Sequence, residues 1–434
     1  MKITRVEATW LRVPIPEEQQ HVSDFGRAAT FDTALVRIET DAGITGVGEA
    51  KVSAGSPGDY HGVIAVINHE FGPGLIGRDP GNIAGIWEGL YSGTRAHYAL
   101  ARGHVFPAMS RRGVSISAIS GIDIALWDIL GQAVGRPIHQ CLGGLARDSI
   151  RTYNTCAGYR YARDTRGQVS ANWGLDGKSE GPYEDLDAFL HRADELAQSL
   201  LEQGITGMKI WPFDPHAEAT DGQYISGPDL QKALEPFRKI RAAVGNRMDI
   251  MVEFHSLWRL TAAQRIAQAL AEFETFWHED PIRMDSLALL KQYAPHSRAP
   301  ICASEILAGR WSFKDLLETG VAGIVMFDLA WCGGITEARR IAALADAWQL
   351  PVAPHDCTGP LVYAASVHFS IWAPNALIQE SVRAFYTGWY NELATHVPQP
   401  VHGYFGKPPG PGIGAELLPE LWKRKDAVVR VSQA

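Results

Sequence analysis

The sequence predicts an α/β protein in which a small α+β domain precedes a large barrel of parallel strands and helices. From about residue 148 onward, short apolar segments alternate with amphipathic helical segments about eight times, which is typical of a (β/α) barrel. The residues before this repeat begin with strand-like alternation and then change to helical spacing, as in an α+β unit. A chain of 434 residues has room for both parts.

The N-terminal domain is expected to contain antiparallel strands and one long helix. Residues 3–13 and 33–39 alternate between apolar and polar side chains, and residues 40–43 have turn chemistry. Further along, residues 118–130 place apolar side chains on one helical face. We place the end of this domain at residue 145.

Eight segments are expected to form the barrel strands, because each is short, apolar and rich in β-branched residues. They are residues 150–155, 205–213, 248–255, 275–280, 300–306, 322–329, 350–355 and 376–380. The helical segments between them include residues 185–202, 228–244, 261–273 and 336–348.

Two further segments complete the expected organisation. The polar residues 160–182 are predicted to be a loop inserted after the first barrel strand. Residues 391–434 are rich in Pro and Gly and are expected to return to the N-terminal domain. The barrel domain is therefore placed at residues 146–390.

Composition excludes several classes of protein. With 40 basic and 48 acidic residues, the net charge of −8 is unsuited to nucleic acid. The five cysteines are scattered without a C-x-x-C pair, which argues against a disulfide or zinc framework and favours the cytoplasm. We expect no stretch of the roughly 20 apolar residues that span a bilayer, and hence no membrane partner.

Carboxylates end three successive predicted strands. In a parallel barrel the functional side chains lie at the C-terminal ends of the strands. Glu253, Glu279 and Glu305 recur there at an interval of 26 residues. Three carboxylates on one rim would repel each other unless a cation neutralised them, and Mg²⁺ prefers oxygen ligands. The pattern predicts one Mg²⁺ site.

The next two predicted strands end in an acid and a histidine. Asp328 and His355 are 27 residues apart, so contact between adjacent strand ends is expected. A carboxylate behind an imidazole fixes its tautomer and raises its pKa, which makes a better general base.

Several motifs together resemble those of the enolase superfamily, in its mandelate racemase/muconate lactonizing enzyme branch, and the chain is similar to galactonate- and mannonate-type sugar-acid dehydratases. The likeness runs nearly from end to end. The motifs are residues 120–128 with 142–144, Trp277 to Pro281, Gly333 to Thr336, Ala353 to His355, Gln379-Glu380 and Pro409 to Gly414.

The resemblance implies a TIM-like (β/α)7β barrel with a capping domain, and chemistry that starts by removing a proton α to a carboxylate. It implies that the three glutamates bind Mg²⁺ and that Asp328 and His355 form the catalytic dyad. It also implies that Glu380 contacts the substrate carboxylate or enolate, and it places Lys209 in the catalytic site.

Two departures from the racemase pattern favour a dehydratase. Racemases of this branch have Lys-x-Lys on the second strand, whereas this chain has Lys209-Ile210-Trp211, so one base is missing. The chain gains His255 two residues after Glu253, and positions i and i+2 of a strand share a face. The resemblance implies that His255 is the acid for the leaving hydroxyl. Because only His355 has an acid on the adjacent strand, we expect it to be the stronger base.

Substrate contacts are expected in the capping loops, residues 16–32 and 50–62, and at the end of the second strand. The candidates are His21, Asp24, Phe25, Arg27 and Trp211. As exposed loop residues, those from the capping loops are at least as consistent with no role in binding.

The prediction is a homo-oligomeric, Mg²⁺-dependent dehydratase of a small acid sugar, an aldonate or aldarate, that forms a 2-keto-3-deoxy acid. An epimerase or lactone cycloisomerase is the alternative within the superfamily. A barrel that binds an acid sugar without turnover is the alternative of another class.

Overall fold

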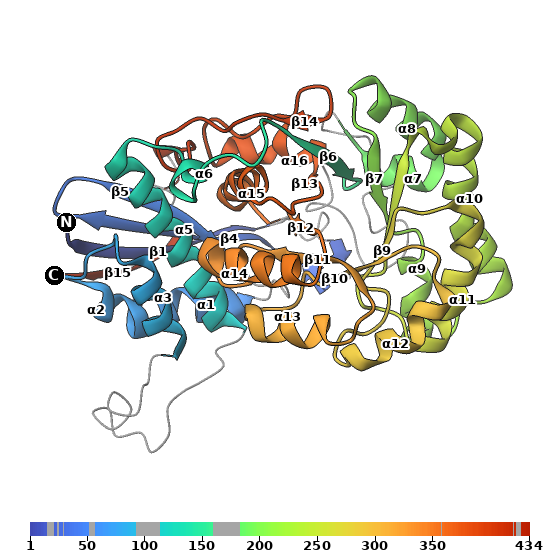
Figure 1. The fold of residues 1–434 in the computed structure, drawn as a ribbon, viewed down its shortest axis with the longest axis horizontal. Coiled ribbons are helices and arrows are strands. Elements are labelled where there is room, and N and C mark those ends of the chain that lie inside the picture. Colours follow the sequence, from blue (N-terminus) through green and yellow to red (C-terminus); the bar gives the residue numbers. More distant parts are fainter. Residues whose placement is uncertain are drawn as a thin grey trace, which may run out of the picture.

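In the computed structural model the chain forms an antiparallel sheet with helices beside it and a parallel barrel (Figure 1). The structure describes residues 1–14, 21–23, 26–28, 30–51, 57–92, 113–158, 183–356, 358–419, 421 and 427–434. The predicted insertion at residues 160–182 lies outside the described part of the chain, as does Cys357. The other four cysteines are free thiols.

The N-terminal sheet has four strands in the order β15-β1-β4-β5, all antiparallel. Its strands are β1 (Ile3–Pro14), β4 (Thr30–Thr40), β5 (Thr45–Ala50) and β15 (Ala427–Gln433). A separate hairpin consists of β2 (His21–Ser23) and β3 (Gly26–Ala28). Because β15 pairs with β1, the C-terminal segment is part of this sheet.

Helices follow the first three strands of the sheet. They are α1 (Pro57–Ala65), a π-helical turn (Val66–Phe71), α2 (Gly72–Leu75), α3 (Ile83–Ser92), α5 (Val114–Val134) and α6 (Ile138–Cys141). Helix α5 lies directly against β5, and glycines make this approach possible. A Cβ on Gly48 would lie 2.1 Å from the carbonyl oxygen of Gly121.

Helix α5 corrects the expectation that the chain has no apolar stretch long enough to span a bilayer. By length and composition it is apolar enough to cross a membrane, although 83% of its most apolar window is buried. The core helix of a globular domain meets the same criterion, so one such helix is weak evidence for a membrane span.

The barrel has eight parallel strands in the order β12-β11-β10-β9-β8-β7-β6-β13. They are β6 (Ile150–Thr155), β7 (Gly207–Ile210), β8 (Asp249–Glu253), β9 (Trp277–Glu279), β10 (Ile301–Ala303), β11 (Ala322–Asp328), β12 (Val352–His355) and β13 (Gln379–Ser381). Backbone hydrogen bonds from Leu377 to Val352 and from Val352 to Asn375 join the segment just before β13 to β12. A short strand, β14 (Tyr404–Phe405), pairs with β6.

Seven of the strands are followed by helices that form the outer layer. These are α7 (Asp185–His191), α8 (Ala193–Glu202), α9 (Asp214–Ala217), α10 (Gly227–Val244), α11 (Leu260–Leu270), α12 (Leu290–Tyr293), α13 (Gly309–Leu317), α14 (Gly334–Ala347) and α15 (Pro360–Trp372). The eighth strand is followed only by the four-residue α16 (Arg383–Tyr386). The barrel is thus of the (β/α)7β type.

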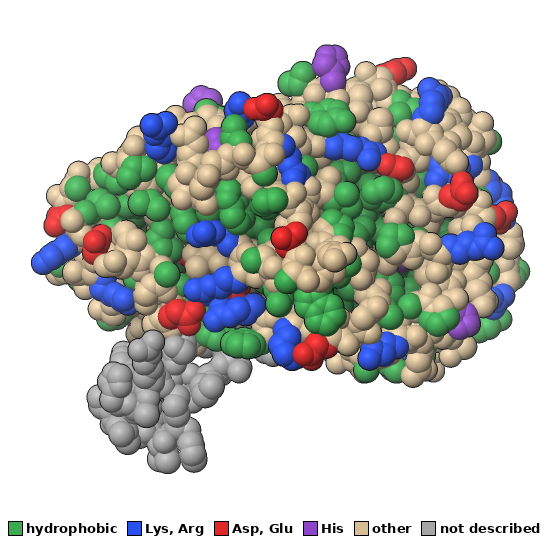
Figure 2. Space-filling view, in the orientation of Figure 1, with side chains coloured by type: hydrophobic (Ala, Val, Ile, Leu, Met, Phe, Trp, Pro, Cys, Tyr) green, Lys and Arg blue, Asp and Glu red, His purple; other side chains and the backbone are tan. Residues whose placement is uncertain are grey.

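The face drawn in Figure 2 carries mixed charge. Lys and Arg side chains lie among Asp and Glu side chains over the described residues of this face. Neither sign forms the continuous stripe that a nucleic-acid backbone would need on this face.

Buried acids of the N-terminal domain attach it to the barrel. Glu49 on β5 accepts hydrogen bonds from the backbone of Leu361 (3.1 Å) and Val362 (3.4 Å) in the first turn of α15. Asp123 on α5 accepts from Thr336 in the first turn of α14 (2.8 Å). Unpaired N–H groups of a first turn favour negative charge. The two contacts place the N-terminal domain over adjacent barrel helices.

We predict that Glu49→Gln makes stability less dependent on pH. Burial raises the pKa of Glu49 from 4.5 to about 7, despite its hydrogen bonds. Because the folded pKa is the higher one, the stabilisation is complete below the unfolded value and is lost as pH rises through about 7. Gln does not titrate, so the variant should lose this pH-dependent part of the free energy of unfolding, up to about 3 kcal/mol.

Urea unfolding at about pH 5 and about pH 8 measures this effect. The control is Glu39→Gln on β4, whose side chain is 29% exposed, and it should keep the wild-type difference between the two pH values. An unchanged difference in Glu49→Gln would contradict the assignment.

Candidate active site

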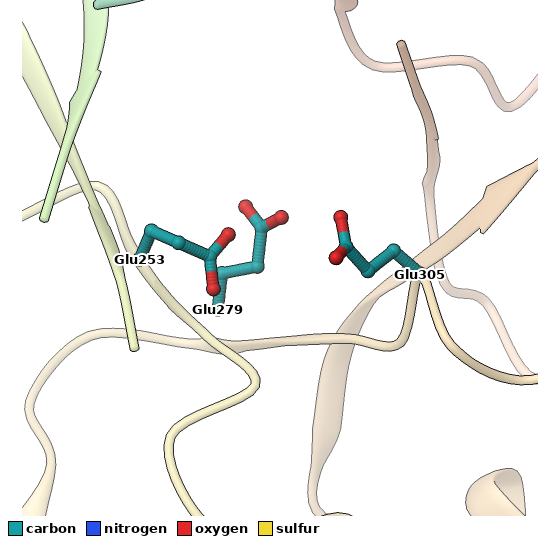
Figure 3. A group of neighbouring side chains, drawn as sticks. All are labelled: Glu253, Glu279 and Glu305. Atoms are coloured by element: carbon teal, nitrogen blue, oxygen red, sulfur yellow. The ribbon is translucent and has the colours of Figure 1, made fainter. Parts of the chain in front are cut away.

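Three glutamates converge at the C-terminal end of the barrel (Figure 3). Glu253 ends β8, Glu279 ends β9, and Glu305 lies two residues beyond β10. One carboxylate oxygen from each lies within 4.8 Å of the others, and all three residues are buried. The structure therefore brings together the three acids that the sequence interval singles out.

Local hydrogen bonds orient two of these carboxylates. Glu253 and Glu279 are register partners on neighbouring strands. The indole Nε1 of Trp277 donates to Glu279 Oε2 (3.0 Å), and the backbone N–H of Phe254 donates to Glu253 Oε1 (2.9 Å). Each side chain is thus held by a residue close to it in sequence, Trp277 within β9 for Glu279 and Phe254 just after β8 for Glu253.

Lys209, on β7, lies among the acids. Its Nζ is 2.8 Å from Glu279, 2.9 Å from Glu380 and 3.3 Å from Glu253. Burial disfavours its charge, but the charges of Glu279 and Glu380 raise the pKa of Lys209 well above its ordinary value. In this arrangement three carboxylates stabilise the charged form of Lys209.

The acids outnumber this cation. Burial, followed by the adjacent charge of Glu253, raises the pKa of Glu279 well above its ordinary range. A buried carboxylate is stable as an anion only when it is paired or bound to a cation. The donors are all carboxylate oxygens that already converge, and this set fits a divalent cation such as Mg²⁺.

Asp328 and His355 are in contact across neighbouring strands. They are register partners on β11 and β12, and His355 Nδ1 lies 2.7 Å from Asp328 Oδ2. His355 Nε2 lies 2.6 Å from Glu305 Oε2. Burial raises the pKa of Glu305, but the charge and hydrogen bond of His355 outweigh it and lower that pKa to about 2. The imidazole thus joins the dyad to the glutamate cluster.

Glu380 is fixed from three sides. Its Oε1 accepts a hydrogen bond from Thr155 and lies beside Lys209, and its Oε2 accepts from the backbone of Asp356 (2.8 Å). Burial raises its pKa, but Lys209 and then His355 outweigh that effect, so the net pKa is lowered.

The strand argument for His255 is wrong in its geometry. Strand β8 ends at Glu253, and His255 and Ser256 have positive φ values of 49° and 57°, so strand alternation does not orient the ring. The ring is instead paired with Asp214, at 2.6 Å between Nδ1 and Oδ2. His255 therefore also has a carboxylate partner, which lies on α9 and not on an adjacent strand. The expectation that His355 is the stronger base stays a prediction.

Asp214 is a site residue that the sequence analysis missed. The predicted strand ran to residue 213, but β7 ends at Ile210, because Pro212 cannot donate to a sheet. Asp214 then opens the short helix α9. An acid followed by proline just past a strand end was the available signal.

The predicted substrate-binding residues have different outcomes. Trp211 is buried and packs edge-on against Phe189 and His255, at centroid distances of 5.1 and 5.7 Å. His21 and Arg27 lie on the β2–β3 hairpin, and nothing is described of their side chains. Asp24 and Phe25 lie outside the described residues.

Comparison with known proteins agrees with this geometry. A model for the mandelate racemase/muconate lactonizing enzyme N-terminal domain matches residues 5–143, and one described as enolase C-terminal domain-like matches residues 192–421. The chain belongs to the enolase superfamily. Among its superfamily relatives is a D-galactonate dehydratase of Ralstonia pickettii, 31% identical over 393 residues, with 88% of each chain covered.

Two solved enolase-superfamily structures cover 100% of this chain and 99% of their own. A mandelate racemase subgroup enolase from Agrobacterium tumefaciens is 46% identical, with a TM-score of 0.78. An enolase protein from Sargasso Sea environmental sequencing is 37% identical, with a TM-score of 0.79.

We predict that Glu279→Gln lowers Mg²⁺ affinity by at least about 100-fold, because a neutral amide cannot offset the charge of the cation. Titration calorimetry with Mg²⁺ measures the loss. The control is Asp249→Asn, at the opposite end of strand β8 and paired with Arg151, and it should bind Mg²⁺ as the wild type does. Equal affinity in Glu279→Gln would contradict a three-carboxylate site.

Proposed function

We propose that this enolase-superfamily chain is a metal-dependent dehydratase of an acid sugar, an aldonate or an aldarate. One observation carries the proposal. His355, which is paired with Asp328, lies 2.6 Å from Glu305 of the buried carboxylate triad. Relatives named D-galactonate dehydratase, about 30% identical over most of the chain, support the same reaction class.

Glu253, Glu279 and Glu305 would hold the metal. When bound, Mg²⁺ would supply positive charge to the substrate carboxylate as negative charge develops on it. Lys209, between Glu253 and Glu279, would offset part of the repulsion between their charges. Glu380, fixed by Lys209 and by the backbone of Asp356, would face the substrate carboxylate or enolate.

His355 would remove the proton α to the carboxylate through Nε2. Asp328 holds Nδ1–H, which fixes the tautomer and stabilises the imidazolium that forms. His255 would then deliver a proton to the β-hydroxyl as the C–O bond breaks. The resulting enol tautomerises to a 2-keto-3-deoxy acid.

Epimerisation is the second candidate, and one observation favours it. His255 also has a buried carboxylate on Nδ1, so each histidine is equipped to carry a proton. A substrate without a leaving group at the β-carbon would then exchange its α-proton without losing water.

We also propose the location, assembly and domain bounds of the protein. It would be a cytoplasmic homo-oligomer with no nucleic-acid or membrane partner, and with domains at residues 1–145, 146–390 and 391–434. The same proposal includes contacts of His21, Asp24, Phe25 and Arg27 with the distal hydroxyls of the substrate, and Trp211 as part of the pocket lining.

A library of acid sugars incubated with the Mg²⁺-loaded protein tests the reaction. Semicarbazide detects the 2-keto product of dehydration. Deuterium from D₂O that enters recovered substrate without keto product would favour the epimerase, and neither signal across the library would contradict both.

We predict that two histidine variants separate the steps. His355→Asn should abolish both dehydration and α-proton exchange, because no enediolate forms. His255→Asn should lower dehydration by about 10²–10⁴-fold and retain exchange, since general acid catalysis contributes this much. The control is His191→Asn, whose side chain is 57% exposed on α7, and it should behave as wild type. Exchange that survives in His355→Asn and vanishes in His255→Asn would instead make His255 the α-proton base.

A further inference from the structure

We infer that Asp214 is a positioning residue that holds His255 by Nδ1 and so directs proton delivery through Nε2 to the leaving hydroxyl. The inference rests on the proposed dehydration. It assigns a role to a residue beyond the expected strand end and gives His255 a support independent of the metal ligands.

The contact is short and buried. Asp214 Oδ2 lies 2.6 Å from His255 Nδ1, and the two side chains are 2% and 11% exposed, respectively. The other oxygen, Oδ1, is buried and accepts no hydrogen bond from the described residues. Burying a carboxylate is unfavourable unless it is paired, so the pairing with His255 accounts for the position of Asp214.

Helix capping does not explain this acid. Asp214 begins α9, which has only four residues. Its described side-chain hydrogen bond goes to the imidazole and not to a backbone N–H of the helix. The carboxylate therefore serves the histidine rather than its own helix.

The main chain and the ring of His255 are held by different contacts. His255 lies in the left-handed region, at φ 49°, where side chains other than glycine are uncommon. Its N–H donates to Glu253 Oε1 (2.7 Å), which fixes the main chain. On one side the ring packs edge-on against Trp211. Asp214 contacts the ring directly at Nδ1 and so limits its rotation.

The arrangement repeats that of His355. Both histidines have Nδ1 against a buried aspartate oxygen, at 2.6 Å for Asp214 and 2.7 Å for Asp328. An imidazole held by Nδ1–H exchanges its other proton through Nε2. The two pairs come from different parts of the rim: β11 and β12 carry one, and the segments after β7 and β8 carry the other.

The step balances without a further reactant. The His255 Nε2 proton goes to the β-hydroxyl oxygen, the C–O bond breaks, and water leaves. The electron pair of the enolate forms the new C=C bond. His255 ends neutral, with its Nδ1–H still donated to Asp214.

The test compares Asp214→Asn with a matched control in the Mg²⁺-loaded enzyme. The control is Asp229→Asn, which alters an aspartate beside another histidine, His216, at 3.5 Å on the surface. Asp214→Asn should lower kcat for dehydration by about 100-fold, change KM by less than about threefold, and retain α-proton exchange. Asp229→Asn should match the wild type in all three.

A double variant separates positioning from general structure. If Asp214 acts through His255, then Asp214→Asn combined with His255→Asn should be no slower than His255→Asn alone. An additional loss close to that of the single Asp214 variant would overturn the inference. So would an unchanged kcat in Asp214→Asn, or loss of α-proton exchange in it.

A readout without turnover distinguishes this inference from the proposed function. In long-range ¹H–¹⁵N spectra of histidine-labelled protein, His255 is assigned by its absence in His255→Asn. Its Nδ1 should carry a proton in the wild type and in Asp229→Asn, and the signal should change in Asp214→Asn. An unprotonated Nδ1 in the wild type would overturn the inference even if dehydration is found. The predicted spectra together with no dehydrated substrate would leave the pairing intact and remove the proposed reaction.

Discussion

Repulsion among buried carboxylates is the constraint that organises this barrel rim. Glu253, Glu279 and Glu305 lie close enough to share a cation, and burial prevents water from screening their charges. Lys209 satisfies part of this excess, and His355 holds Glu305. The negative charge that remains suits this rim to a divalent cation.

Much of this site could be predicted from the sequence, because in a parallel barrel the spacing of the strands along the chain determines which side chains lie at the same rim. Strands that recur every 26 or 27 residues deliver their last side chains to one rim, and this places Glu253, Glu279, Asp328 and His355. Neighbouring strands also share register, so the contact between Asp328 and His355 followed from order alone.

The positions of His255 and Asp214 could not be predicted in this way, because the backbone beyond the strand ends has no regular spacing. Strand β8 stops at Glu253, and positive φ values at His255 and Ser256 turn the chain. Strand β7 also stops early, so Asp214 reaches the rim from a short helix. Residue type can indicate that such segments leave the sheet, but the partner of each side chain depends on tertiary structure.

The N-terminal domain is attached to one side of the barrel rim, the side formed by the strands of Asp328 and His355. Helix α14 follows the strand of Asp328, and α15 follows the strand of His355. Asp123 and Glu49 anchor to the first turns of these two helices. The N-terminal domain is therefore anchored beside the strands that carry Asp328 and His355. In the proposed reaction, loops of this domain could change with the substrate while their position relative to His355 is kept, and the glutamate cluster, carried by other segments of the rim, need not change with them.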